Sequence, residues 1–199
     1  MPQIYFMKKL REKFNVLHKF SDNEWNYFAQ KFTPKTFERD ELLLRAGQVE
    51  RYLYFIKTGL VRKYYLRQGR EHCIDFMMDN QLVSSYASFV QQKPSSLNIR
   101  AIKKTDVKAI SYTEMQDIYC NTDIGNKMGR LICEQLYVNK VIRESSLIME
   151  SPDKRFQRLV ENKKDWILHV PQYFLASYFN LTPETLSRIK RRNFKNRTS

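Results

Sequence analysis

The apolar residues of this chain follow a helical period near both ends and a strand-like pattern between them. Residues 4–14 form a short amphipathic segment, in which Ile4, Leu10 and Phe14 are available to pack. Residues 21–24 then form a capping box, in which a serine and a glutamate bond each other's backbone N–H groups. This box predicts a helix that buries three aromatic residues at helical spacing: Trp25, Phe28 and Phe32.

From residue 33 to residue 111 the pattern changes to short aliphatic and aromatic runs separated by turn residues. Gly47, Gly59 and Gly69 each follow such a run. The runs predict strands at 42–44, 52–56, 60–66, 72–77, 97–102 and 106–111. Evenly spaced short strands with glycine at the corners are typical of an antiparallel sandwich or roll.

Residues 114–150 contain no proline, and residues 124–150 predict a long helix of about 40 Å at the usual rise of about 1.5 Å per residue. One stripe along it alternates steps of four and three residues, as a coiled-coil seam does. Its members are Ile124, Met128, Leu131, Gln135, Val138, Ile142, Ser145 and Met149. The seam could pack on the roll of the same chain. We favour parallel self-association, because Ile132, Leu136 and Val141 lie off the seam and can pack on the roll instead.

The last quarter of the chain predicts a separate domain. Residues 151–153, Ser-Pro-Asp, break the long helix and form a hinge. Residues 154–161 suit a helix with three apolar residues turned inward: Phe156, Leu159 and Val160. Residues 166–170 (WILHV) form a short β-like run, which we interpret as one strand of a wing.

Residues 170–192 predict two short helices around a tight turn. Pro171 suits a helix start, where its missing N–H costs nothing. Asn180 can adopt the left-handed conformation that ends a helix. Thr182 then serves as the N-cap of the second helix, with Pro183 as its first residue. The second helix buries two apolar residues, Leu186 and Ile189.

The outer side of this second helix carries residue types that read a DNA major groove. Glutamate can accept from the cytosine amino group, and arginine can bind guanine bidentately. Glu184 and Arg188 are four residues apart and project from one face. The alternative is a surface salt bridge between them on an ordinary helical hairpin. The candidate DNA contacts are Gln172, Tyr173, Thr182, Glu184, Thr185, Ser187, Arg188, Arg191 and Arg192.

The charge of the chain favours an anionic partner. The formal net charge is +14, which suits nucleic acid or a membrane surface. Residues 151–199 hold five Lys and six Arg against two Asp and two Glu, a net +7, so half of the charge lies in a quarter of the chain. This excess coincides with the two-helix motif.

Two parts of the chain resemble the CRP/FNR family of bacterial transcription regulators. The runs FLASY (174–178) and LTPETLSR (181–188) are similar to the family's C-terminal motif, in which the glutamate and arginine at positions 184 and 188 contact bases. Asn180 stands where the family commonly has glycine. The run YFIKTGLVR (54–62) is similar to the family's cyclic-nucleotide-binding roll.

The resemblance implies an α+β fold in three parts. Residues 1–123 would form an antiparallel β-roll (jelly roll) with flanking helices, which acts as a sensor domain. Residues 124–150 would form a long dimerisation helix. Residues 151–199 would form a winged helix-turn-helix that binds DNA.

The ligand site of the roll departs from the family. Cyclic-nucleotide binders use a Gly-Glu pair, followed by an Arg-Ser or Arg-Thr pair; the corresponding segments here, 80–85 and 93–96, lack the Gly-Glu pair and have Ser95 in place of the arginine. A buried phosphate without its guanidinium loses about 1.5–3 kcal/mol, so we do not expect tight binding of cyclic AMP. The roll is either packed and empty, or it binds an unknown small-molecule effector through Ser84, Ser85, Tyr86, Ser95 and Ser96.

Cys73, Cys120 and Cys133 are widely spaced and include no CxxC pair, so they indicate neither a disulfide framework nor a metal site. Iron–sulfur members of the family use an N-terminal cysteine cluster that is not present here, so we expect no cofactor. The N-terminal segment has no apolar core typical of a signal peptide, and no run approaches about 18 apolar residues. We therefore expect a cytoplasmic protein without a membrane partner.

The combined prediction is a homodimeric transcription regulator that binds double-stranded DNA at a near-palindromic operator, with RNA polymerase as a further candidate partner. The alternative is a ligand-sensing or protein-interaction module with only nonspecific DNA binding. An enzyme is the weakest class, because no catalytic constellation or phosphate loop stands out.

Overall fold

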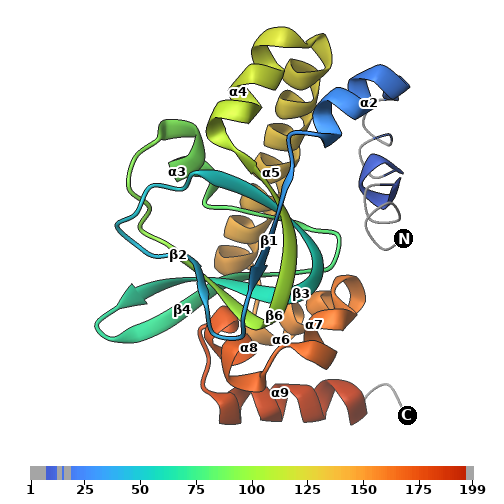
Figure 1. Cartoon of the computed structure of the whole chain (residues 1–199). Helices are drawn as coiled ribbons and strands as arrows, with labels where there is room; N and C mark the ends of the chain where they lie inside the picture. The colour runs from blue at the N-terminus through green and yellow to red at the C-terminus, as the bar shows by residue number, and fades with distance from the viewer. Residues whose placement is uncertain (1–7, 13–14, 16–18, 196–199) are drawn as a thin grey trace. The chain divides into compact units, whose positions relative to one another are not determined.

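The computed structural model describes residues 8–12, 15 and 19–195 (Figure 1). The chain has an α+β architecture, with a six-stranded sheet and helices before and after it. It forms two compact units: Met1–Lys63 with Met77–Leu136, and Tyr64–Phe76 with Tyr137–Ser199. The second unit therefore contains the end of a β-hairpin as well as the C-terminal helices, a combination that the sequence pattern does not suggest.

The sheet has the strand order β1-β6-β3-β4, with β2 also paired to β6 and β5 to β3. Antiparallel pairing joins β1 to β6, β2 to β6 and β3 to β5, as expected for a jelly-roll-like sheet. Figure 1 shows α2 and α4 beyond one end of this sheet. The strands are β1 (Thr33–Phe37), β2 (Leu42–Leu44), β3 (Tyr52–Arg67), β4 (Arg70–Met78), β5 (Leu82–Val83) and β6 (Asn98–Ser111).

The predicted break at Gly59 is wrong, because β3 runs through this residue. Gly59 has a φ of 138°, and a Cβ there would lie 2.4 Å from Oγ1 of Thr105 on β6. The glycine therefore permits close approach of two strands and does not make a turn. The predicted pair of strands at 97–102 and 106–111 is likewise one strand, which pairs with β2 near its start and with β1 further on.

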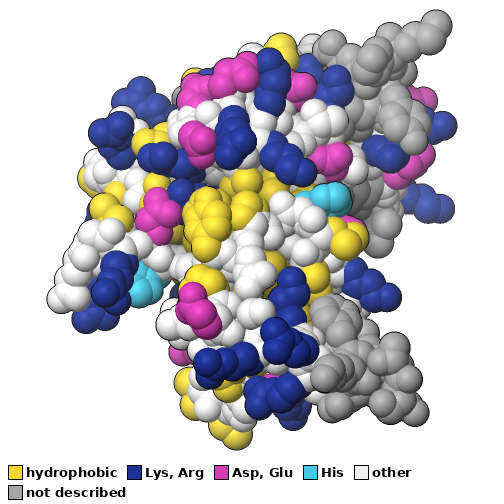
Figure 2. All heavy atoms as spheres, turned by 90° about the horizontal axis from the view of Figure 1, so that it is seen from below, with side chains coloured by type: hydrophobic (Ala, Val, Ile, Leu, Met, Phe, Trp, Pro, Cys, Tyr) yellow, Lys and Arg dark blue, Asp and Glu magenta, His cyan; other side chains and the backbone are white. Residues whose placement is uncertain are grey.

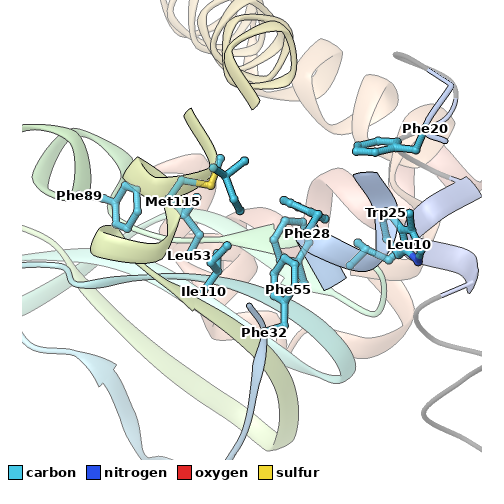
Figure 3. Packing of buried hydrophobic residues seen from close by; sticks show 11 residues of the cluster. Leu10, Phe20, Trp25, Phe28, Phe32, Leu53, Phe55, Phe89, Ile110 and Met115 are labelled. Atoms are coloured by element: carbon cyan, nitrogen blue, oxygen red, sulfur yellow. The ribbon is translucent and has the colours of Figure 1, made fainter. Parts of the chain in front are cut away.

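The predicted N-terminal capping box is present. Ser21 Oγ accepts from the Glu24 N–H at 3.3 Å, and Glu24 Oε2 accepts from the Ser21 N–H at 2.9 Å. The helix that follows, α2 (Asp22–Ala29), adds aromatic side chains to the main core of the first unit (Figure 3). Ile4 and Phe14 lie outside the described residues. The core contains Leu10, Phe20, Trp25, Phe28, Phe32, Leu53, Phe55, Phe89, Ile110, Met115 and Ile118.

The long helix predicted over residues 124–150 is present, and a separate shorter helix precedes it. α4 (Tyr112–Asn121) ends at Thr122, and α5 (Asp123–Met149) begins directly afterwards. Gly125 lets the start of α5 approach α4 closely, since a Cβ there would lie 2.6 Å from the Ile118 carbonyl oxygen. α5 supplies residues to both compact units. Among the described helices, none combines the length and the apolar character needed to cross a membrane.

The remaining helices are α3 (Tyr86–Gln91), α6 (Pro152–Asn162), α7 (Lys164–His169), α8 (Gln172–Phe179) and α9 (Pro183–Lys195). The predicted break after α5 is confirmed: Ser151 caps α6, its Oγ accepting from the Lys154 N–H at 3.3 Å. The predicted inward residues of α6 are buried, namely Phe156, Leu159 and Val160.

The interpretation of residues 166–170 as a strand of a wing is wrong, because these residues lie in α7 and its C-cap. A strand would bury alternate residues, including Leu168, but Leu168 is 74% exposed. The buried residues are instead Trp166 and Val170, four residues apart, which is the helical spacing. Within the described residues after α5 there is no strand.

Candidate nucleic-acid interface and sensor site

The turn between α8 and α9 forms as the sequence predicts. Asn180 has a φ of 56°, in the left-handed region, and its N–H donates to the Ser177 carbonyl at 3.0 Å. The Leu181 N–H donates to the Ala176 carbonyl at 2.9 Å, so the last turn of α8 has its carbonyl groups satisfied. The chain can therefore leave α8 and begin α9 within three residues.

The start of α9 is capped by Thr182, whose Oγ1 accepts from the Thr185 N–H at 3.3 Å. Leu186 and Ile189 are 0% and 2% exposed, and both lie on the side of α9 that is buried in its unit. Together with the buried Leu175 of α8, they make the two helices one packed pair. α8 and α9 are thus two packed helices joined by a tight turn, and α9 keeps one outward-facing side.

The predicted DNA contacts are arranged around this outward side. Most are exposed, and Thr185 and Ser187 are partly exposed. Figure 2, viewed from below, shows Lys and Arg side chains gathered in its lower part with few Asp or Glu side chains among them. The exposed candidates are Gln172 and Tyr173 on α8, Thr182 in the turn, and Glu184, Arg188, Arg191 and Arg192 on α9.

The surface salt bridge that could explain Glu184 and Arg188 is not formed. Among the described residues, no hydrogen bond or ion pair joins their side chains. The pKa of Glu184 is lowered first by its own backbone N–H and then by the Thr182 hydroxyl, with Arg188 the weakest contribution. A carboxylate that is ionised and satisfied at a helix start leaves the Arg188 guanidinium available to a ligand.

Arg192, a predicted DNA contact, also makes an ion pair within the chain. Its Nη2 lies 2.8 and 2.9 Å from the two carboxylate oxygens of Asp153 at the start of α6. This contact ties α9 to α6 and partly neutralises the charge of Arg192. Of the two arginines near the end of the predicted surface, Arg191 is therefore the clearer candidate for a phosphate contact.

The serines of the predicted effector site lie close together. Ser85 Oγ and Ser95 Oγ are 2.9 Å apart, and both residues are buried, as is Ser84. Ser96 is exposed and lies outside this cluster. Tyr86 is only partly buried, and its hydroxyl lies 2.9 Å from Cys133 Sγ. Three of the five candidate residues, Ser84, Ser85 and Ser95, therefore form a cluster of buried hydroxyl groups.

A buried carboxylate that the sequence pattern does not reveal lies beside these serines. Glu50 is 1% exposed and accepts from the backbone N–H groups of Ser85 and Tyr52, each at 3.2 Å. The Glu50 N–H donates to Ser88 Oγ at 3.0 Å. Burial raises the pKa of Glu50 to about 7, although the hydrogen bonds that its carboxylate accepts lower it. In the sequence Glu50 stands in a polar turn next to Arg51 and resembles a surface residue.

The chemistry of this cluster is unsuited to an anion. Its described members are Glu50, Ser84, Ser85, Ser88 and Ser95, none of which carries a positive charge, and Ser84 Oγ is buried without a hydrogen bond of good geometry. An ionised carboxylate would repel a phosphate placed beside it. The cluster can bind a neutral or cationic group, or it can stabilise the empty roll.

The buried carboxylate predicts a pH-dependent stability. Because the folded pKa of about 7 lies above the unfolded value near 4.5, the folded state binds the proton more tightly, so the free energy of unfolding falls as the pH rises from about 4.5 through 7. The loss is on the order of 3 kcal/mol. Of this full loss, about 2 kcal/mol should appear between pH 5.5 and pH 8 when the wild type is unfolded by denaturant at those two pH values. It should be much smaller in Glu50→Gln, which stays neutral.

Glu161→Gln, at an exposed position of α6, is the control and should retain the wild-type pH dependence. If Glu50→Gln shows the same decline as the wild type, a group other than Glu50 causes it.

The sequence and the fold of this chain are similar to those of known proteins. Residues 34–121 match the family model of the cyclic nucleotide-binding domain. This span covers the strands from β1 to β6 and reaches the end of α4, so this part of the chain is a domain of that type, most of which lies in the first unit. No curated protein matches the sequence of the chain significantly.

Solved structures extend the similarity to both units. FixK2 from Bradyrhizobium japonicum is 19% identical and has a TM-score of 0.69, with 83% of this chain and 85% of that chain covered. The c-di-GMP responsive global regulator CLP from Xanthomonas campestris is 15% identical, with a TM-score of 0.66 and coverages of 88% and 93%. A CooA variant from Carboxydothermus hydrogenoformans is 16% identical, with a TM-score of 0.66 and coverages of 94% and 84%. The chain shares the fold of these CRP/FNR-type regulators.

Proposed function

We propose that this chain is a sequence-specific DNA-binding transcription regulator of the CRP/FNR type. The main observation is the α8–α9 pair, whose turn and caps hold α9 with Glu184 and Arg188 on its exposed side. Those two side chains can accept from cytosine and donate to guanine at base edges in a major groove. The net charge of +7 over residues 151–199 would supply affinity through phosphates.

Dimerisation is the second part of the proposal. In the single chain, several apolar side chains of the second half of α5 are exposed, including the seam residues Val138 at 47%, Ile142 at 51% and Met149 at 82%. The off-seam residue Ile132 packs against the core of the first unit, as predicted. Leu136 and Val141 remain 38% and 41% exposed, so they do less of this packing than expected. A second copy of α5 is the partner that best fits such a seam.

The proposed dimer would place two copies of α9 in successive major grooves of a near-palindromic operator. We assign the protein to the cytoplasm and assign it no enzymatic activity. RNA polymerase and an unknown small-molecule effector are candidate partners. The alternative function is a ligand-sensing or protein-interaction module that binds DNA nonspecifically; the buried cluster around Glu50 favours it, because a sensor needs a specific polar site.

The test of the proposed function is selection of duplexes from a random pool by the full-length chain. We expect enrichment of near-palindromic sites whose half-sites lie about 10 base pairs apart. The selected operator should bind more tightly than a scrambled duplex at every salt concentration. Equal, strongly salt-dependent binding to all duplexes would instead favour the alternative function.

The sensor site gives a further prediction. Isothermal titration with cyclic AMP at millimolar concentration should give no saturable heat beyond dilution, because Ser95 cannot neutralise a phosphate and Glu50 repels one. The buffer titration is the control. A dissociation constant in the micromolar range would contradict this prediction and would require a cation near the site.

A further inference from the structure

Tyr178, near the end of α8, is enclosed by side chains from three other elements of its compact unit. The Arg143 guanidinium of α5 lies 3.6 Å from the centre of the Tyr178 ring. Trp166 of α7 and Phe76 of β4 meet the same ring, with centroid distances of 5.2 and 6.0 Å. Trp166 also packs edge-on against Phe76 at 5.0 Å. Tyr178 is therefore the place where α5, α7, α8 and the hairpin meet.

Arginines also satisfy the carbonyl groups at the C-terminal end of α8. Arg143 Nη2 donates to the Tyr178 carbonyl at 2.9 Å, and Arg155 Nη2 lies 3.5 Å from the Phe179 carbonyl. These carbonyls directly precede the left-handed residue Asn180, and a helix end favours cations. Arg143 thus contacts the last turn of α8, just before the α8–α9 turn, in two ways. It binds the backbone carbonyl of Tyr178, and it lies against the aromatic ring of the same residue.

The hairpin holds α8 from a second direction. Ser177 Oγ donates to the Glu71 carbonyl at 2.7 Å and accepts from the Cys73 N–H at 3.0 Å, so it bridges two backbone groups of β4. Lys163 Nζ lies 3.8 Å from the Trp166 ring centre and 3.8 Å from Asp75 Oδ1. The two residues that precede Phe179 are therefore both anchored to elements outside the α8–α9 pair.

Stability alone does not explain an arginine at position 143. Burial lowers the pKa of Arg143, and Tyr178 and Asp75 offset this only in part, so the charged form is held at a cost. Among the described residues, Arg143 makes no ion pair with a carboxylate. An apolar residue of similar size would avoid this desolvation cost. What the arginine adds is directional: one hydrogen bond and one contact with the Tyr178 ring that fix the end of α8.

Arg143 also follows a seam residue directly. Ile142 is exposed and Arg143 is partly buried, so adjacent residues of α5 face in different directions, about 100° apart around the helix. One segment of α5 thus carries the proposed dimer contact on one side and the contact with α8 on another.

We propose that Arg143 is a positioning residue for DNA recognition: through the Tyr178 ring and carbonyl it fixes the α8–α9 turn, and it thereby couples the α5 seam to the base-reading side of α9. This inference rests on the proposed function. The coupling predicts that loss of Arg143 harms discrimination between DNA sequences more than it harms nonspecific binding, because nonspecific binding depends on charge and tolerates a misplaced helix.

The experiment compares Arg143→Ala with Arg130→Ala in the full-length chain. Arg130 lies on the same helix but makes only an exposed ion pair with Glu134. We expect Arg143→Ala to lower the ratio of operator affinity to scrambled-duplex affinity about tenfold, a change of about 1.4 kcal/mol. Arg130→Ala should leave the ratio unchanged. Tyr178→Phe keeps the ring and should also leave it unchanged, whereas Tyr178→Leu should behave like Arg143→Ala.

Hydrogen exchange without DNA provides an independent measurement. In Arg143→Ala the amides of residues 180–182 and 184–186 should exchange faster, while those of α2 should not change. A wild type that prefers its operator, combined with an unchanged affinity ratio or unchanged exchange in Arg143→Ala, would overturn the positioning role. A wild type without any operator preference would overturn the proposed function, and exchange would then decide separately whether Arg143 fixes the turn.

Discussion

The variant Val138→Glu with Ile142→Glu is expected to be a folded monomer with greatly weakened operator binding. Both side chains are about half exposed in the single chain, so glutamate can be accommodated without cost to the fold. In a dimer the same positions would bury four unpaired carboxylates, two from each chain, against an apolar seam. Loss of the second DNA-binding unit removes its effective concentration and should lower operator affinity by about 10²–10⁴-fold.

Sedimentation equilibrium measures the mass of the variant, and a duplex titration measures its affinity. The matched control is Tyr137→Glu with Lys140→Gln, which makes the same change in charge at exposed positions of α5 outside the seam. This control should remain dimeric and should bind DNA with near wild-type affinity. A dimeric Val138→Glu, Ile142→Glu variant would show that the subunits associate through another surface.

Local backbone chemistry is the part of the fold that the sequence predicts well. The capping box over residues 21–24 and the cap at Thr182 each depend on one or two side chains that bond their own neighbours, and the left-handed Asn180 depends on the backbone preference of that residue type. Such interactions do not depend on distant residues. Residues 170–192 alone were therefore enough to predict the two-helix motif. They also predicted that Leu186 and Ile189 are buried, which the structure confirms.

Features that depend on distant residues were predicted poorly. In the sequence Gly59 resembles a turn residue. The structure instead places it inside β3, where its lack of a Cβ lets the strand approach Thr105 of β6. The run at 166–170 has β-forming residues, but Trp166 has aromatic neighbours on two other elements, and these favour a helix there. Glu50 and Arg143 are ordinary charged residues in the sequence. Only the tertiary structure brings Glu50 beside buried serines and Arg143 against the ring of Tyr178. No local signal in the sequence could have identified either residue.

Arg188→Ala is expected to relax the sequence preference of the protein at one base pair in each half-site. A bidentate contact between arginine and guanine provides about 1–3 kcal/mol of discrimination, so operator affinity should fall by that amount and random-duplex affinity should fall less. Arg188 is exposed on α9 and makes no ion pair with Glu184 in the described structure, so no internal contact is lost. A surface ion pair would have been worth less than about 1 kcal/mol.

Arg191→Ala is the variant that distinguishes recognition of base sequence from electrostatic attraction to DNA. Arg191 lies almost one helical turn further along α9, and as a phosphate contact it should contribute equally to operator and random duplex. Its loss should weaken both and reduce the salt slope by about one unit. Arg192→Ala is a poorer comparison, because Arg192 is paired with Asp153 and its loss also weakens the packing of α9 on α6.

The measurement is a set of titrations of the wild type, Arg188→Ala and Arg191→Ala against operator and scrambled duplexes at several salt concentrations. Single base-pair changes in the operator then show which position loses its preference in Arg188→Ala. If Arg188→Ala lowers both affinities equally and shifts the salt slope as Arg191→Ala does, α9 binds DNA through charge alone. The specificity would then have to arise from other side chains, of which Glu184 is the first to test.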